Sequence, residues 1–245
     1  FSVSTIHSFI WTLIKPFQAD IKKCLISFKQ EKGFSDKFYS DIRLKNSHTG
    51  IFTTVTAYAE NSYIAKTVAF VFLGRMVDIL SLDNDIPLIL SEHDRITSFP
   101  FQSTTRRALE KEDFIMAFNV ARKLEKEQPI LLKAIGWYSK GKTSNNVLDR
   151  FLAYWNAIEI ISARYHKDTE RTCKGIKNMA YQCFLDYFGE VDSWELPYNW
   201  IDDMYEKRNR IAHGAEETSA EAINAVTELI PTIESTSRKL IYSVL

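Results

Sequence analysis

The chain has 245 residues, of which 45% are hydrophobic and 13% aromatic, enough for a sizeable core in one large or two small domains. Its formal net charge is zero, which argues against a globally basic nucleic-acid binder but leaves room for a local basic surface. No uncharged run of 18 apolar residues occurs, so the sequence predicts no membrane-spanning helix. The chain starts at Phe1 without an initiator Met, which suggests a fragment of a longer protein or a trimmed one. Its start lacks a signal-peptide pattern, and we expect a cytoplasmic protein.

The first hundred residues are typical of a small α+β region. Apolar residues three or four positions apart predict a helix over residues 8–30. Residues 33–50 are polar and rich in turn formers, which predicts a loop. A β-branched and aromatic run predicts a strand over residues 51–58, and a dense apolar pattern predicts a helix over residues 65–82. The short apolar run 86–90 contains a proline near its start, which suits an edge strand.

The composition becomes helical after a candidate boundary at residues 100–103, so we expect domains at 1–103 and 104–245. The N-terminal domain carries no motif that indicates a reaction. The helices expected in the second domain are 105–127, 130–139, 147–165, 170–188, 197–213, and a last one that starts with the capping box Thr218–Glu221. The predicted class is therefore mainly α, with a C-terminal antiparallel helical bundle and a smaller N-terminal α+β region.

Cysteine and histidine spacing argues against metal sites and disulfides. Cys24, Cys173 and Cys183 are scattered without CxxC spacing, which predicts free, buried thiols in a reducing compartment. The five histidines are also scattered and form no ligand pattern. We therefore expect no metal and no cofactor.

The stretch Tyr205–Gly214 concentrates the polar chemistry of the chain. On a helix over 197–213, Arg208 falls on the apolar stripe, where a guanidinium is costly unless it is paired. The helix over 147–165 carries Glu159 among large apolar residues on its own stripe. Each charge alone is anomalous, so the pattern predicts that Glu159 and Arg208 face one another.

The same stretch contains groups that suit metal-independent RNA cleavage. A histidine such as His213 can transfer protons, while Arg208 can stabilise charge on a phosphate. Asn209 lies one turn before His213 and can position a phosphate, a base edge or the imidazole. One histidine supplies half of an acid–base pair, which predicts a homodimer. Plainer interpretations are a histidine at a helix C-terminus, a structural ion pair, and solvated cations at Lys207 and Arg210.

The motif Tyr205-x-x-Arg-Asn-x-x-Ala-His-Gly214 resembles the signature of HEPN domains (higher eukaryotes and prokaryotes nucleotide-binding), in its Apea-like version. The segment from Asp149 to Glu159, with its Trp-x-x-x-Glu spacing, and the segment Ala134–Tyr138 are similar to the same group. The resemblance covers residues 105–245.

The resemblance implies a metal-independent endoribonuclease that acts by 2′-hydroxyl attack on the adjacent phosphate, in antiphage defence, abortive infection or a toxin system. Arg208 and His213 would be catalytic, Asn209 and Glu159 supporting, and Lys207 and Arg210 RNA-binding. The expected partners are RNA, a second copy of the chain, and a regulatory partner or trigger. The alternative is a non-catalytic HEPN module that binds a nucleotide, RNA or a protein.

Overall fold

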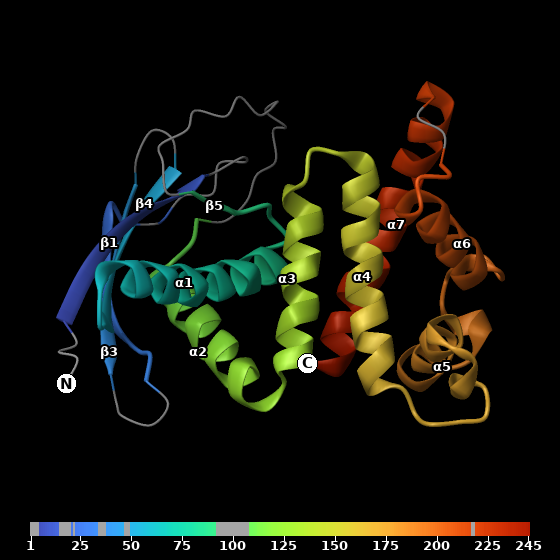
Figure 1. Ribbon diagram of the computed structural model, residues 1–245, viewed down its shortest axis with the longest axis horizontal. Helices are drawn as coiled ribbons and strands as arrows, with labels where there is room; N and C mark the ends of the chain where they lie inside the picture. Colours follow the sequence, from blue (N-terminus) through green and yellow to red (C-terminus); the bar gives the residue numbers. More distant parts are fainter. Residues whose placement is uncertain are drawn as a thin grey trace. The chain divides into compact units, whose positions relative to one another are not determined.

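The computed structural model describes residues 5–14, 21, 23–33, 38–46, 50–91, 108–216 and 219–245. The chain forms two compact units, Phe1–Lys126 and Glu127–Leu245. The described part is mainly helical with one sheet near the N-terminus (Figure 1), as the sequence predicted. The candidate boundary at residues 100–103 lies outside the described residues, whereas the two units divide after Lys126.

The N-terminal unit is built on a five-stranded sheet in the order β2-β3-β4-β1-β5. All of its pairings are antiparallel. The strands are β1 (Thr5–Ile14), β2 (Leu25–Glu31), β3 (Tyr39–Asn46), β4 (Gly50–Ala59) and β5 (Ile89–Ser91). β4 confirms the strand predicted over residues 51–58, and β5 is an edge strand as its proline-containing run indicated.

The prediction of a helix over residues 8–30 is wrong, because this segment contributes β1 and β2. In β2, Ile26, Phe28 and Gln30 are buried while their neighbours are exposed. Such a period of two defines a strand with one covered face. The apolar residues of the segment fit both periods, and pairing with the rest of the sheet decides between them.

The loop predicted over residues 33–50 is also wrong, because it contains β3. Ser40, Ile42 and Leu44 are buried, and the charged residues between them face outward. Three charges in a short run look like a loop, but their alternation with apolar residues is that of a half-solvated strand.

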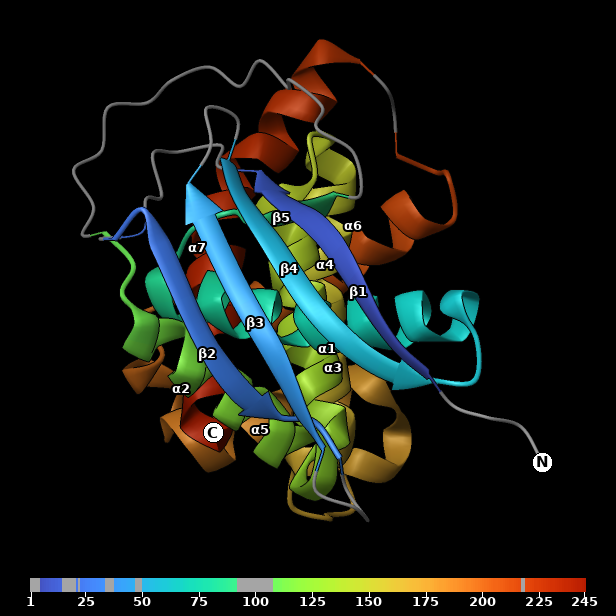
Figure 2. The same ribbon diagram turned by 90° about the vertical axis from the view of Figure 1, so that its left-hand side faces the viewer.

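Two helices cover one face of this sheet, α1 (Ser62–Asn84) and α2 (Lys111–Glu127) (Figure 2). The helix predicted over residues 65–82 is confirmed by α1, whose first turn is capped by the side chain of Asn61. From α2, the ring of Phe118 lies 6.0 Å from Phe28 and 4.7 Å from Phe72, measured between centroids. This apolar contact makes α2 part of the sheet unit, although the sequence assigned it to the helical domain.

The C-terminal unit is entirely helical in the residues that are described. Its helices are α3 (Pro129–Thr143), α4 (Val147–Tyr165), η1 (Thr172–Lys174), α5 (Ile176–Phe188), η2 (Val191–Ser193), α6 (Trp200–Ala212) and α7 (Ala220–Val244). Pro129 opens α3 and the Asn146 side chain caps α4, as predicted. The predicted helix over 170–188 is divided by Gly175 into η1 and α5. None of the described helices is long and apolar enough to cross a membrane.

Helix α4 lies at the centre of this unit and packs against α3, α5, α6 and α7. Its most buried face carries Phe151, Tyr154 and Trp155, which are fully covered. Figure 1 shows α4 antiparallel to α3, while α7 runs in the same direction as α4. The bundle therefore departs from the simple antiparallel arrangement that short connections suggested, because a longer path through α5 and α6 leads back to α7.

One carboxylate joins α3, α4 and α7. Glu234 accepts a hydrogen bond from the Tyr154 hydroxyl at 2.9 Å and lies 2.6 Å from the Lys142 ammonium. Burial, and then the negative charge of Glu234, raise the pKa of Tyr154 well above its ordinary value. Gly141 lets α3 approach this tyrosine, since a Cβ there would lie 2.6 Å from the ring.

The three cysteines are free, as the sequence predicted. Burial raises the pKa of the Cys183 thiol to about 12, which keeps it protonated at neutral pH. The predicted burial is wrong for Cys24 and Cys173, which are exposed.

Candidate functional site

The motif stretch forms α6 and the turn that ends it. The amide of Ala215 donates to the carbonyl of Arg210 at 2.8 Å, and the amide of Gly214 donates to Ile211 at 3.2 Å. These two bonds, with Gly214 at φ +70°, form a Schellman motif. The glycine that follows His213 therefore has a structural reason, because this turn requires left-handed backbone.

Arg208 and Glu159 meet, as their positions on two apolar stripes predicted. A guanidinium nitrogen of Arg208 lies 3.3 Å from a carboxylate oxygen of Glu159, and its other terminal nitrogen donates to the Asn209 side chain at 3.0 Å. Their side chains are 28% and 14% exposed, respectively. The pair therefore joins α6 to α4 at a place where water screens it only partly.

The second oxygen of Glu159 is occupied by a buried tryptophan. The indole nitrogen of Trp155 donates to it at 2.8 Å, one helical turn earlier in α4. The Trp155 ring also lies 6.2 Å from Trp200 and 6.5 Å from Tyr205, between centroids. Glu159 thus accepts from the core on one side and from α6 on the other, which fixes its position.

His213 lies outside this network. It is the residue at the C-terminal cap of α6, and it is exposed. Its amide donates to Asn209 at 3.0 Å, so the one-turn spacing of these two residues is that of the helix backbone. The structure thus brings Glu159, Arg208 and Asn209 together and leaves the imidazole in solvent. Catalytic roles for Arg208 and His213 stay predictions.

Lys207 and Arg210 share a carboxylate that the sequence did not single out. The Lys207 ammonium lies 3.1 Å from one oxygen of Glu216, and Nε of Arg210 lies 3.0 Å from the other. The Glu216 side chain is only 4% exposed, and of the two cations, which were expected to be solvated or to face RNA, Lys207 is partly covered and Arg210 is exposed. The available signal was the turn at Gly214, which returns the following residues toward α6.

Another ion pair escaped the sequence reasoning. Glu195 and Lys239 lie 3.3 Å apart beside a cavity between α7 and the connection from α5 to α6. They are 44 positions apart in the chain, and neither belongs to a motif. No local pattern predicts such a contact.

The comparisons with known proteins concern the C-terminal unit. Residues 134–242 match the family described as "Methylamine utilization protein MauJ". The match begins inside α3, contains all of α4 to α6, and ends near the C-terminus of α7. It covers less than half of the chain. Neither the curated proteins nor the solved structures gave a match.

This match overturns the resemblance to HEPN domains, because it assigns the same helices to a different family. The endoribonuclease function, RNA binding, and the antiphage defence, abortive infection and toxin roles are overturned with it. The local geometry explains how the motif misled. Arg208 makes an ion pair between α6 and α4, and Gly214 forms the turn that ends α6. Both motif residues therefore have structural roles that do not require catalysis.

Proposed function

We propose that this chain acts in methylamine utilization as an accessory protein, through its C-terminal helical unit. The observation that carries the proposal is the family match over residues 134–242, which takes in nearly all of that unit. The match contains every motif residue considered above, from Glu159 to His213. The N-terminal sheet unit lies outside the match, and its role is not part of the proposal.

The contact surface that we propose is the end of α6. Three cations, Lys207, Arg208 and Arg210, share the carboxylates of Glu159 and Glu216, and Arg210 is the most exposed of the three, at 48%. The exposed imidazole of His213 adds a further donor. Because partly covered ion pairs hold this surface in place, it suits an anionic group on a partner protein.

The role in methylamine utilization is tested by deleting the gene in its host. The deletion strain is expected to grow as the parent does on ammonium and to grow more slowly on methylamine as the nitrogen source. A plasmid copy should restore growth. Equal growth of parent and deletion strains on methylamine would overturn the proposal.

The contact surface is tested by complementation with an Arg210→Ser, His213→Ser double variant. Both side chains are exposed, and Glu216 keeps its contact with Lys207, so the variant is expected to fold. We expect poorer growth on methylamine than with the wild-type gene. Lys177→Met is the matched control, because it removes an exposed cation of α5 that pairs with Asp202 in the first turn of α6, away from the end under test. Full complementation by the double variant would remove α6 from the proposal.

We also propose that the chain forms a homodimer, as the single histidine suggested. What supports it is the start of α7, whose first turns extend beyond α4 in Figures 1 and 2 and leave Ile223 38% exposed. Light scattering is expected to give twice the chain mass, and Ile223→Glu is expected to lower it. A monomer at all concentrations would overturn this part. The cytoplasmic location stays a prediction, which cell fractionation tests.

A further inference from the structure

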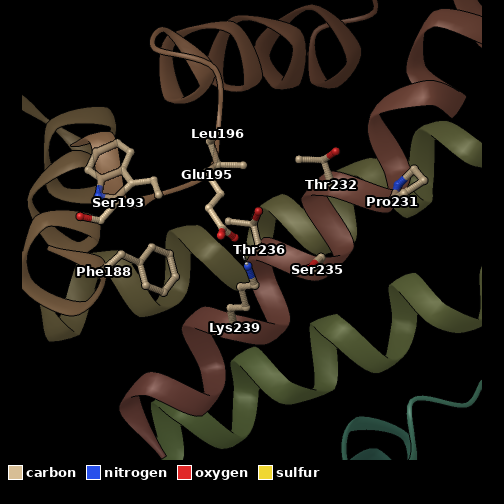
Figure 3. A pocket seen from close by; sticks show the side chains of 10 residues that line it. Phe188, Ser193, Glu195, Leu196, Pro231, Thr232, Ser235, Thr236 and Lys239 are labelled. Atoms are coloured by element: carbon tan, nitrogen blue, oxygen red, sulfur yellow. Dashed lines mark hydrogen bonds and ion pairs between the residues drawn. The ribbon is translucent and has the colours of Figure 1, made fainter. Parts of the chain in front are cut away.

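A cavity of about 380 Å³ lies beside α7 in the C-terminal unit (Figure 3). Phe188, Leu196 and Pro231 provide apolar walls, and Ser193, Thr232 and Ser235 provide hydroxyl groups. Its volume falls within the range of roughly 300–1,000 Å³ that is usual for small-molecule sites. The cavity therefore has room for a ligand with an apolar part and a few polar groups.

The charges in this cavity are one carboxylate and one ammonium. Figure 3 shows the Glu195 carboxylate pointing toward the ammonium of Lys239, with 3.3 Å between oxygen and nitrogen. Their side chains are 81% and 61% exposed. Because an exposed ion pair is worth little in water, a ligand with charges of its own can separate the two at small cost.

The backbone holds Glu195 in an uncommon conformation. Its φ is +56°, in the left-handed region that side chains other than glycine seldom adopt. Among the described non-glycine residues only Asp85, which ends α1, shares this feature. The preceding Trp194 is buried and donates to the Gly189 carbonyl at 2.9 Å, which anchors the strained residue. A conformation of this kind persists only where its surroundings enforce it, and such residues cluster at binding sites.

The charge pattern selects the class of ligand. A simple anion would meet Lys239 but would be repelled by Glu195, and a simple cation would face the opposite conflict. A molecule with both charges satisfies both side chains and replaces one ion pair with two. We propose that this cavity binds a small zwitterion with one ammonium, one carboxylate and an apolar side chain, as in an aliphatic α-amino acid. The proposal rests on the cavity alone and does not depend on the role in methylamine utilization.

The test compares three probes that differ only in their charges. These are L-leucine, 4-methylpentanoate, which lacks the ammonium, and 3-methylbutylamine, which lacks the carboxylate. Isothermal titration of the full chain is expected to show leucine binding roughly threefold more tightly than either analogue, because each contact is made with an exposed charge and contributes only modestly. Equal affinities for the three probes, or no saturable binding of leucine, would overturn the proposal.

Two variants and one control locate the site. Lys239→Met is expected to lower the affinity for leucine roughly threefold and to abolish the preference for leucine over the amine. Glu195→Gln should lower the affinity for leucine to a similar extent and abolish the preference for leucine over 4-methylpentanoate. Lys177→Met, which removes an exposed cation outside the cavity, should bind leucine as the wild type does. Unchanged leucine binding in both cavity variants, with circular dichroism showing all proteins folded, would place any binding elsewhere and reject the site.

Discussion

Two ion pairs in the C-terminal unit have the same separation and opposite surroundings. Arg208–Glu159 and Lys239–Glu195 both place nitrogen and oxygen 3.3 Å apart. The first pair is mostly covered and shares its carboxylate with Trp155, whereas the second lies largely in water. Distance alone would rank them as equals. Burial and the additional hydrogen bond make the first a structural link and leave the second available to a ligand.

The largest expected effect comes from removing the covered carboxylate. Glu159→Leu should lower the free energy of unfolding of the C-terminal unit by about 3 kcal/mol, because the Trp155 indole and the Arg208 guanidinium both lose an acceptor. Urea unfolding followed by tryptophan fluorescence measures it, since four of the five tryptophans lie in this unit. A loss as small as the one expected for Lys239→Met, which breaks the exposed pair, would contradict the comparison.

The ammonium of Lys32, in the N-terminal unit, is a covered charge that has no carboxylate partner among the described residues. Burial lowers the pKa of Lys32 to about 8, and its nitrogen has no hydrogen-bond partner among the described residues. Below pH 8 both the folded and the unfolded chain carry this proton, so the full cost of burying the charge is present. As the pH rises from about 8 toward the ordinary value of 10.5, the folded chain loses the proton first and gains stability.

Lys32→Met should therefore stabilise the protein at pH 7, and its advantage over the wild type should shrink above about pH 8. Urea unfolding of both proteins by circular dichroism at several pH values measures the difference. The Phe72 ring, 5.0 Å from the Lys32 nitrogen, offers a partial substitute for a carboxylate. A constant difference from pH 7 to pH 10 would show that the ammonium is better solvated than its burial indicates.

A smaller effect on stability is expected at Gly214, the glycine that ends α6. Gly214→Ala should cost about 1 kcal/mol, because nothing crowds the new Cβ but the residue must hold φ +70°. Gly74→Ala in α1 is the matched control. It also has open space but lies in helical backbone, where alanine is expected to raise the stability. Thermal unfolding of the two variants gives the comparison, and equal signs would contradict it.

The smallest expected effect belongs to the exposed pair. Lys239→Met should change the free energy of unfolding by less than about 0.5 kcal/mol, since its charge is already hydrated. The urea midpoint is the measurement. A loss comparable to that of Glu159→Leu would make Lys239 a structural residue and weaken the case for the cavity.

Local sequence patterns determined much of the helical unit. Pro129 and Asn146 marked the starts of helices through backbone chemistry that needs no distant partner. The meeting of Glu159 and Arg208 also followed from sequence, because a charge on an apolar stripe is costly until it finds its opposite. Strand β4 and helix α1 were also visible, β4 from its alternating pattern and α1 from a long, densely apolar run.

Tertiary structure alone decided the rest. The apolar residues of β2 fit a helix and a strand equally well, and only the neighbouring strand supplies the hydrogen bonds that choose between them. The exposure of His213 depends on what packs around the end of α6, and although Gly214 indicates a turn there, the motif does not show which side chains the turn covers. The contact of Glu195 with Lys239 joins two distant segments without a shared pattern. Local chemistry fixes what a short segment prefers, whereas packing fixes which segments meet and therefore where cavities and clusters of charge form.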